Sequence, residues 1–412
     1  MFDEKTIWII NQYASTAETG LGGRHYYIAQ EMAKKGHQVY LIAGSYSHLL
    51  HNYKSFEESY FVEEVEKNFH FVWVNLPKYD NAHSKQRIIN EFLFSKKVKK
   101  LVNVIHDKPD VILHSSPALI SYFGAKYLSH YYKIPYAFEV RDIWPLTLVK
   151  LGGYSPKHPF IRLLQWIEDK AYQKADYVFS NLPNATEHMQ ARGMIKNKFT
   201  WIPNGVSLSE FKNKRPLNQS VLAKIPDNKF IVGYTGTIGE ANAMSYFIES
   251  AAILKDNQNI HFVLVGAGKY KDDLIKQVEL LGLNNVAFIE PIAKNEVQSM
   301  LGCFDVCYIG WHKKSMYRFG IAANKIPEYM YSAKPVIHSF SGEGDFIQQA
   351  QSGITVEAEN PQAIADAILE IYALDNLERE LMGQRGNAFV LENLTYEKLT
   401  KKLEHTLFKG ES

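Results

Sequence analysis

The stretch from Arg318 to Ile337 combines basic residues with a loop that leads into a helix, a pattern that suits an anionic ligand. The stretch begins with Arg318 and becomes an amphipathic helix that carries Asn324, Lys325 and Glu328. Asn324 and Glu328 are four residues apart, so they share one face of that helix. Because a helix N-terminus presents free N–H donors and positive potential, we expect it to bind an anion, above all a phosphate.

Two glycine-rich loops each follow an apolar strand. Gly20-Leu-Gly-Gly23 precedes a helix that starts near Arg24, and Gly233-Tyr-Thr-Gly236-Thr-Ile-Gly239 holds the same place in the second half of the chain. Glycines allow backbone N–H groups to approach a phosphate or a sugar closely. The alternative for each loop is a tight turn without a ligand. A third candidate, Gly266-Ala-Gly268, lacks the last glycine of a dinucleotide fingerprint, so NAD binding is poorly supported.

Arg141 and Asp142 follow the apolar strand Tyr136–Val140. Catalytic groups of parallel sheets often lie at this end of a strand. An arginine cannot act as a general base, but it can bind a phosphate or orient a hydroxyl. Asp142 is the candidate for positioning an acceptor, ahead of Glu139. The alternative is an internal salt bridge between Arg141 and Asp142.

Alternating strands and helices must position these residues. Thr6–Asn11 and Val39–Ala43 are apolar strands on either side of the first glycine loop, and the strand Phe230–Thr235 begins the same pattern again. Two such series predict an α/β protein with two doubly wound, Rossmann-like domains whose ligand-binding edges face each other across a cleft. We place the first domain at 1–205 and the second at 206–391, with a final helical segment 392–412.

Composition excludes several classes of protein. The 412 residues carry a net charge of +2, so no nucleic-acid partner is expected. The two cysteines, Cys303 and Cys307, suit buried positions and a reducing compartment rather than a disulfide. The fifteen histidines show no metal-binding spacing, so no metal is expected. With no signal segment and no apolar run of about 18 residues, we expect a cytoplasmic protein whose membrane contact, if any, is peripheral.

The segment 85–108 is the candidate for such a contact. It reads as an amphipathic helix with seven basic residues against two acids, and three apolar residues, Phe92, Leu93 and Phe94, lie among them. One interpretation is an ordinary solvated helix face. The other is a contact with the anionic headgroups of a membrane.

The sequence also resembles a known family. Gly320-x-x-x-Asn-Lys-x-x-Glu-Tyr-Met330, followed by Ala-Lys-Pro-Val-Ile337, resembles the donor-site motif of retaining glycosyltransferases of family 4, which have the GT-B fold. Three further segments agree in the same order, namely Arg141-Asp-Ile-Trp-Pro145, Ile202-Pro-Asn-Gly-Val206 and Leu264-Val-Gly266. The resemblance is closest to the branch that builds bacterial surface polysaccharides, such as O-antigen and capsule.

The resemblance implies a role for each candidate. The first glycine loop approaches the donor diphosphate and the acceptor, the second touches the donor phosphates and ribose, and Glu328 binds the ribose hydroxyls. The catalytic candidates are Arg141, Asp142 and Glu328. The donor-binding candidates are Gly22, Gly23, Gly236, Thr237, Gly239, Arg318, Asn324, Lys325 and Glu328. The final helix, from about Thr395, is expected to cross back onto the first domain.

The implied reaction moves a sugar from a nucleotide diphosphate sugar to a hydroxyl with retention of configuration. The donor is expected to be UDP-linked, with an acetamido sugar as a family-level choice, and the acceptor a glycan or a lipid-linked sugar. No cofactor or metal is expected. Two alternatives stay open: a sugar-nucleotide 2-epimerase on the same fold, and a non-catalytic sugar-nucleotide-binding subunit.

The sequence departs from the family pattern at two places. Gly320 occupies the position of the first glutamate of the family's paired-glutamate motif. Glu240 and Asn242 stand where many members carry basic residues that bind the diphosphate. We expect a nearby basic run to replace these residues, and the alternative for it is a solvated loop. The basic run is Lys313, Lys314, Arg318 and Lys325.

Overall fold

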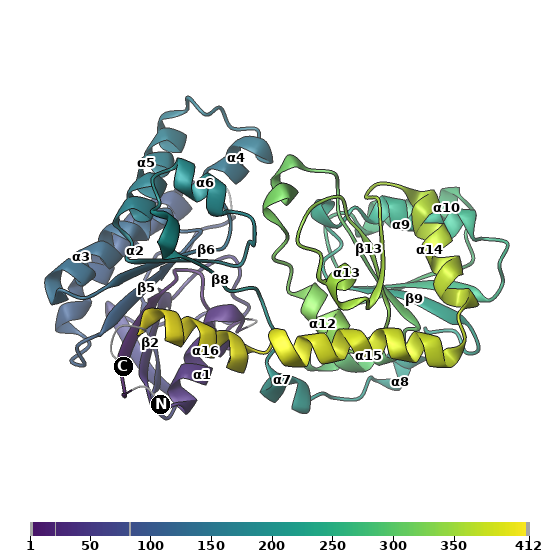
Figure 1. Cartoon of the computed structure of the whole chain (residues 1–412), viewed down its shortest axis with the longest axis horizontal. Helices are drawn as coiled ribbons and strands as arrows, with labels where there is room; N and C mark the ends of the chain where they lie inside the picture. Colours follow the sequence, from purple (N-terminus) through teal and green to yellow (C-terminus); the bar gives the residue numbers. More distant parts are fainter. Residues whose placement is uncertain (1–2, 21, 82–83, 409–412) are drawn as a thin grey trace. The chain divides into compact units, whose positions relative to one another are not determined.

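A computed structural model of the chain describes residues 3–20, 22–81 and 84–408, and Leu21 of the first glycine loop lies outside them. The chain forms two compact units (Figure 1). Unit 1 comprises residues 1–203 and 396–412, and unit 2 comprises residues 204–395. The expected boundaries, 205/206 and 391/392, therefore differ from the observed ones by two residues and by four.

Unit 1 is built on an eight-stranded sheet in the order β3-β4-β2-β1-β5-β6-β7-β8. All neighbouring strands are parallel except β3 and β4, which are antiparallel. The inner strands are almost continuous apolar runs, as expected for strands that helices cover on both faces. The strands are β1 (Thr6–Ile10), β2 (Gln38–Gly44), β3 (Tyr60–Glu66), β4 (Phe69–Val74), β5 (Val111–Ser115), β6 (Tyr136–Val140), β7 (Tyr177–Ser180) and β8 (Phe199–Trp201).

The edge strand β3 lies in a segment, 45–68, that its irregular pattern predicts to be an insertion or a loop. Only tertiary pairing with β4 makes it a strand. Its sequence is rich in glutamate, and Glu63 bonds to the indole of the buried Trp73. Charged residues are typical of exposed sheet edges, because they discourage pairing with another chain.

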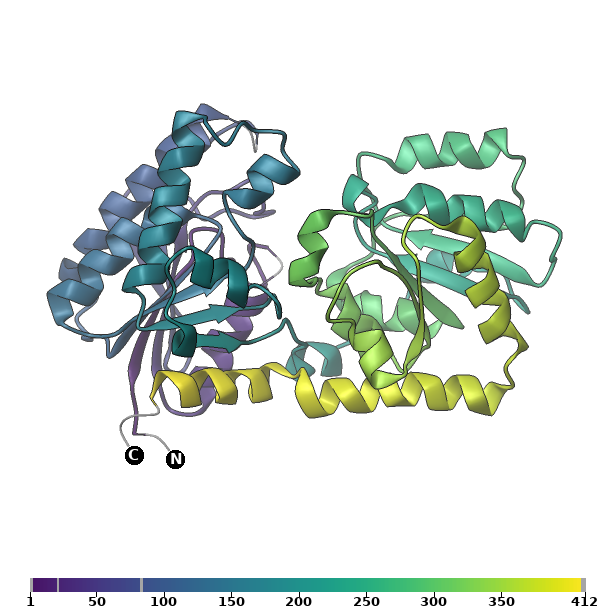
Figure 2. The same ribbon diagram turned by 45° about the horizontal axis from the view of Figure 1, so that its top comes forward.

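Helices cover both faces of this sheet. α1 (Arg24–Lys34) and α16 (Tyr396–Leu407) pack together on one face (Figure 1). α2 (Lys85–Val98), α3 (Tyr122–Tyr132) and α5 (Pro159–Lys174) lie side by side on the other, as both views show (Figures 1 and 2). Shorter elements are the 3₁₀ turns η1 (Lys99–Asn103), η2 (Leu119–Ser121) and η3 (Lys196–Lys198) and the helices α4 (Leu146–Lys150) and α6 (Thr186–Ala191).

The C-terminal helix α16 belongs to unit 1, although α15, which precedes it, belongs to unit 2. The apolar stripe Tyr396, Leu399, Leu403 and Leu407 joins the core of unit 1. Glu404 accepts hydrogen bonds from the side chains of Lys35, at 2.5 Å, and His37, at 2.9 Å. Apolar burial and a partly buried ion pair therefore hold this helix on the first domain.

Unit 2 contains a six-stranded, fully parallel sheet in the order β11-β10-β9-β12-β13-β14. Its strands are β9 (Phe230–Thr235), β10 (Ile260–Val265), β11 (Val286–Ile289), β12 (Val306–Gly310), β13 (Val336–Ser339) and β14 (Gly353–Val356). Its helices are α7 (Leu208–Lys212), α8 (Gln219–Leu222), α9 (Met244–Ile253), α10 (Lys271–Leu280), α11 (Val297–Gly302), α12 (Lys325–Tyr331), α13 (Phe346–Ala350), α14 (Pro361–Ala373) and α15 (Asn376–Asn393), with the 3₁₀ turns η4 (Glu240–Asn242), η5 (Lys294–Glu296) and η6 (Ser315–Phe319).

Both sheets end their parallel strands at an edge where ligands of such folds bind. In unit 1, the loop before α1 follows β1, and Arg141 follows β6. In unit 2, the Gly236 loop follows β9 and the basic run follows β12. The free cysteine Cys307 is buried in β12, and Cys303 lies just before that strand.

Candidate active site

The second glycine loop and Lys325 are 89 positions apart in the chain but lie against each other in unit 2. Gly236 has φ +136°, and a Cβ atom at this residue would lie 2.3 Å from Cε of Lys325. A Cβ atom at Gly266 would lie 2.0 Å from the carbonyl oxygen of Gly236. The loop thus needs both glycines, since Lys325 packs against one of them and the next loop packs on its backbone.

The ammonium group of Lys325 has two neutral acceptors. Its Nζ donates to Oη of Tyr234 at 2.8 Å and to Oδ1 of Asn242 at 3.0 Å. Burial lowers the pKa of Lys325 to about 8, and the nearby Glu328 only partly offsets this effect. No acid forms an ion pair with Lys325 in the described part of the chain. A cation that is partly shielded from water and has no acidic partner is stabilised by an anionic ligand, because the ligand supplies a negative charge.

Tyr234 and Asn242 also shape the loop. Both side chains donate to the carbonyl oxygen of Thr237, Tyr234 at 2.6 Å and Asn242 at 2.9 Å. Asn242, which departs from the basic residue of many family members, therefore holds both the loop and the lysine. The sequence pattern did not identify Tyr234, since a tyrosine in a buried strand reads as core.

Glu328 lies on α12, one turn after Lys325, and pairs with Lys294 of η5. Its backbone N–H bonds to the carbonyl of Asn324 at 3.4 Å, and Asn324 itself is exposed at the start of the helix. In the same helix, the buried Tyr329 hydroxyl donates to the carbonyl of Thr235 at 2.8 Å and accepts from the Thr235 N–H at 2.7 Å. Tyr329 thus fixes α12 against the strand that carries the glycine loop.

α12 is a short helix of seven residues, and its start has no side-chain cap. A helix of fewer than two turns contributes little dipole, so the anion affinity expected here depends on side chains and on the glycine loop instead. Gly320 has φ +92°. A glutamate there would be strained, because residues with a Cβ rarely adopt this conformation. The backbone conformation at this position therefore suits glycine and disfavours a glutamate.

The four residues of the basic run differ in their contacts and exposure. Lys313 forms an exposed ion pair with Glu357 at 2.7 Å, so it does not offer a free charge. Arg318 is exposed on η6, with its guanidinium 4.7 Å from the ring centroid of Phe319. Lys314 is also exposed. Of the four, Lys325 is the one that the fold places against the glycine loop.

In unit 1, the first glycine loop leads into α1. Gly22 and Gly23 both have positive φ angles, and no side chain caps the helix. A Cβ atom at Gly23 would meet no atom within 4 Å, so the backbone there is open on that side. The N–H groups of the first turn of α1 are therefore not occupied by a cap, as the predicted role of this loop requires.

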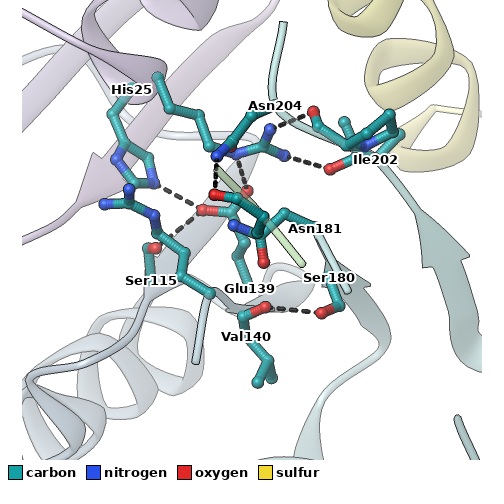
Figure 3. A network of polar contacts seen from close by, with 12 residues as sticks. His25, Ser115, Glu139, Val140, Ser180, Asn181, Ile202 and Asn204 are labelled. Carbon is teal, nitrogen blue, oxygen red and sulfur yellow. Dashed lines mark hydrogen bonds and ion pairs between the residues drawn. The ribbon is translucent and has the colours of Figure 1, made fainter. Parts of the chain in front are cut away.

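Directly behind this loop lies a buried polar network around Glu139 (Figure 3). The Glu139 carboxylate accepts hydrogen bonds from Arg24 Nε at 2.8 Å, His25 Nε2 at 2.6 Å and Ser115 Oγ at 2.7 Å. Burial alone would raise the pKa of Glu139, but the charges of Arg24 and Arg141 and the hydrogen bond from His25 hold it well below its usual range. Both carboxylate oxygens are occupied, so Glu139 positions its neighbours rather than a substrate.

The two basic residues of this network have further partners. Arg24 donates to the carbonyl oxygens of Pro203 at 2.5 Å and Ile202 at 2.9 Å, which ties α1 to the segment after β8. Burial lowers the pKa of His25, against the effect of Glu139. Neutral His25 therefore donates from Nε2 to Glu139 and accepts at Nδ1 from Asn11, at 3.0 Å.

Arg141 and Asp142 do not form the salt bridge that the sequence left open. Asp142 instead accepts from the indole of Trp144 at 3.0 Å and from the hydroxyl of Thr147 at 2.6 Å, which fixes the turn after β6. The Nε atom of Arg141 is buried and has no hydrogen-bond partner in the described chain. An unsatisfied buried donor is costly, so Arg141 has the donor capacity that a phosphate or hydroxyl would satisfy.

Three further observations concern metal-binding groups, membrane-spanning helices and His114. Residues 3–20, 22–81 and 84–408 contain no group of three or more His, Cys, Asp or Glu side chains arranged to hold a metal ion. No helix in these ranges has the length and apolar character needed to cross a membrane. His114 is a satisfied core residue, bonded to Tyr136 and Ser121, and burial lowers its pKa to about 4.

Two family models match the chain. The model described as Glycosyltransferase Family 4 matches residues 20–210, and the model described as Glycosyl transferases group 1 matches residues 229–373. The first match lies almost wholly in unit 1 and the second in unit 2. Each carries one of the two glycine loops.

Curated relatives are distant. The putative colanic acid biosynthesis glycosyl transferase WcaI of Escherichia coli (strain K12) is 24% identical over 212 residues, which are 50% of this chain and 52% of that protein. The alpha-D-kanosaminyltransferase of Streptomyces kanamyceticus is 25% identical over 259 residues, 59% of this chain and 64% of that protein. The chain thus spans between about half and two thirds of the length of these relatives.

Solved structures match over nearly the whole chain. The structure of Anabaena Alr3699/HepE in complex with UDP and glucose superposes with a TM-score of 0.68 at 13% identity, covering 98% of this chain and 100% of that one. At this level of identity the match establishes the fold, which is that of two-domain GT-B proteins.

Proposed function

Because this chain is a glycosyltransferase with the GT-B fold, built from a family 4 domain and a group 1 domain, we propose that it transfers a sugar from a UDP-linked donor to a hydroxyl acceptor with retention of configuration. The observation that carries the proposal is the half-buried ammonium of Lys325 against the Gly236 loop. A cation with only neutral partners, next to a glycine loop, suits the diphosphate of a nucleotide sugar.

The rest of the donor would lie along the same edge of unit 2. The backbone of Gly236, Thr237 and Gly239 binds the phosphates, and Glu328 accepts hydrogen bonds from the ribose hydroxyls. Lys294, which pairs with Glu328, orients that carboxylate. UDP as the nucleotide agrees with the UDP that the HepE structure contains.

In this proposal electrostatics, rather than a protein nucleophile, drives the reaction. As the bond to the leaving diphosphate breaks, negative charge grows on its oxygens, and Lys325, Arg318 and the loop N–H groups stabilise that charge. No metal or other cofactor takes part. The leaving phosphate takes the proton of the acceptor hydroxyl, while Arg141 orients the acceptor and Asp142 fixes the turn that presents Arg141.

The proposed setting is the synthesis of a bacterial surface polysaccharide in the cytoplasm, on the inner face of the cell membrane. The acceptor is a glycan or a lipid-linked sugar, and the donor sugar belongs to the acetamido class. The similarity to WcaI, whose name refers to colanic acid biosynthesis, supports this setting. The segment 85–108 is the proposed membrane contact.

Release of UDP in the presence and absence of acceptor tests the proposal. The full chain is incubated with UDP-N-acetylglucosamine or another UDP-sugar, alone and with a panel of lipid-linked and free glycan acceptors, without added metal. A transferase releases UDP only when an acceptor is present. Release of a free sugar or a UDP-linked epimer without acceptor would instead establish an epimerase. Binding of the UDP-sugar without any turnover would indicate a non-catalytic subunit.

A further inference from the structure

The outer surface of the layer formed by α2, α3 and α5 is the feature from which we draw a further inference. The three helices lie side by side over one face of the unit 1 sheet (Figures 1 and 2). Their inner sides complete the core, for example where Tyr132 meets Trp8 and Tyr172 meets Phe138. Their outer sides carry exposed apolar and basic residues.

The outer stripe of α2 combines basic and apolar residues. Lys85, Ile89, Phe92, Lys96 and Lys99 follow one another at steps of four, three, four and three residues, which places them on one helical face. All five are exposed, and the side chains of Ile89 and Phe92 are 49% and 46% exposed. Two exposed apolar side chains therefore lie between lysines on this face.

Two basic residues of segment 85–108 form hydrogen bonds within the protein and do not contribute to its outer surface. Arg87 turns inward, where its Nε donates to the Tyr13 hydroxyl at 3.0 Å. Lys97 donates to the carbonyl of Asn75 at 2.8 Å. The exposed positive charge of segment 85–108 therefore comes from five of its seven basic residues, namely Lys85, Lys96, Lys99, Lys100 and Lys108.

Aromatic residues of the neighbouring helices continue this surface. Nζ of Lys99 lies 5.7 Å from the ring centroid of Tyr127 on α3, whose ring in turn lies 6.1 Å from that of Tyr131. Phe123, on the same helix, lies 6.1 Å from Trp166 of α5. Tyr127, Tyr131 and Trp166 are 41%, 55% and 48% exposed. Contacts thus link the exposed residues of the three helices.

Acidic residues do not offset the basic charge. The helices α2, α3 and α5 and the turn η1 contain three acids. Glu91 and Glu168 are buried. Asp169 is held by Arg192 through two hydrogen bonds of 2.7 Å. This outer surface is therefore positively charged as well as aromatic.

We propose that this surface, which we call the three-helix face, binds the headgroups of an anionic phospholipid membrane. The three-helix face comprises Lys85, Ile89, Phe92, Lys96, Lys99, Lys100, Tyr127, Tyr131 and Trp166. Lysines are attracted to anionic headgroups, while tyrosine and tryptophan favour the level of the headgroups. The proposal deepens the proposed function, on which it rests, by naming the surface and the lipid class where lipid-linked acceptors would be met.

Sedimentation with lipid vesicles tests the proposal. The full chain is mixed with vesicles of phosphatidylcholine alone or with added phosphatidylglycerol, and we expect binding only to the latter, weakened by salt. Each lysine contributes about a fivefold change in affinity. The triple variant Lys96→Glu, Lys99→Glu, Lys100→Glu should therefore bind the vesicles at least about 100-fold more weakly than the wild type. A matched control reverses three exposed lysines of unit 2, Lys212, Lys214 and Lys276, and should bind like the wild type.

A second measurement tests the aromatic part of the face. Brominated phosphatidylglycerol quenches tryptophan fluorescence at the headgroup level, and the Trp166→Phe variant should lose most of that quenching while still binding. The proposal is wrong if the wild type does not bind phosphatidylglycerol vesicles, if the triple variant binds as tightly as the wild type, or if the unit 2 control loses binding equally. Self-association through this face without vesicle binding would also contradict it.

The test of membrane binding can fail or succeed independently of the test of glycosyltransferase activity. Titration with UDP reports on unit 2, so a triple variant that keeps UDP affinity but loses vesicle binding supports the membrane proposal alone. A wild type that binds vesicles without turning over any UDP-sugar supports the three-helix face while contradicting the glycosyltransferase proposal.

Discussion

The two glycine loops of this protein hold their cations in opposite ways. Behind the loop of unit 1, Arg24 is fully buried, ion-paired with Glu139 and bonded to backbone carbonyls. Beside the loop of unit 2, the hydrogen-bond partners of Lys325 among the described residues are a tyrosine hydroxyl and an amide oxygen. The first cation is satisfied by the protein itself, and the second is left for a ligand. The cation beside the first loop thus has a structural role, whereas the cation beside the second loop is, in our proposal, part of an anion site.

Removal of the counter-charge in unit 1 should have the largest effect. In Glu139→Ala, Arg24 and His25 lose their buried partner, and we expect the free energy of unfolding to fall by about 3–5 kcal/mol, as for other broken buried pairs. Urea unfolding of the two variants Glu139→Ala and Lys325→Met measures the contrast. A loss below about 1 kcal/mol for Glu139→Ala would remove the distinction between the two loops.

Removal of the cation in unit 2 should change binding instead. In Lys325→Met, UDP affinity should fall by about 1.5–3 kcal/mol, because a charged hydrogen-bond donor to the diphosphate is lost. Uridine, which has no phosphate, should bind almost as before. Calorimetry with both ligands measures this, and equal losses for UDP and uridine would place Lys325 away from the diphosphate. Lys276→Met, at an exposed site of unit 2, is the matched control.

Glu328 should affect the nucleoside rather than the phosphates. In Glu328→Ala we expect both UDP and uridine to bind more weakly by about 1–3 kcal/mol, since the ribose loses a charged acceptor. Glu328→Gln should lose less, because the amide keeps one acceptor. Unchanged UDP affinity in a folded Glu328→Ala variant would contradict the ribose role.

The pH dependence of UDP binding should be the smallest effect. The pKa of Lys325 is lowered to about 8 by burial in the free protein, and a bound diphosphate would raise it. Binding therefore takes up a proton near pH 8, and UDP affinity should fall as the pH rises from 7 to 9. Isothermal titration in buffers of different ionisation enthalpy measures the proton uptake. The Lys325→Met variant should show none, whereas an unchanged pH profile in that variant would assign the effect to another group.

The sequence allows most of the fold to be predicted, because buried parallel strands are apolar runs between helices. It also gives the glycine loops, Arg141, Lys325 and Glu328 as candidates for the site, and their roles stay predictions. It does not reveal β3, whose pairing is tertiary, or the partners Tyr234, Asn242 and Lys294, which lie on separate elements. Neither does it show that Lys97 and Arg87 turn inward. The direction and the partners of a side chain depend on packing across the sheet, which no local pattern records.

The most direct test of the account is calorimetric titration of the wild-type chain with UDP and then with GDP, without added metal. The account predicts micromolar binding of UDP, little binding of GDP, and UDP binding that is weaker by about 1.5–3 kcal/mol in Lys325→Met. Binding of neither nucleotide, or UDP binding that is the same in Lys325→Met, would contradict the claim that unit 2 keeps a cation ready for the diphosphate of a UDP-sugar.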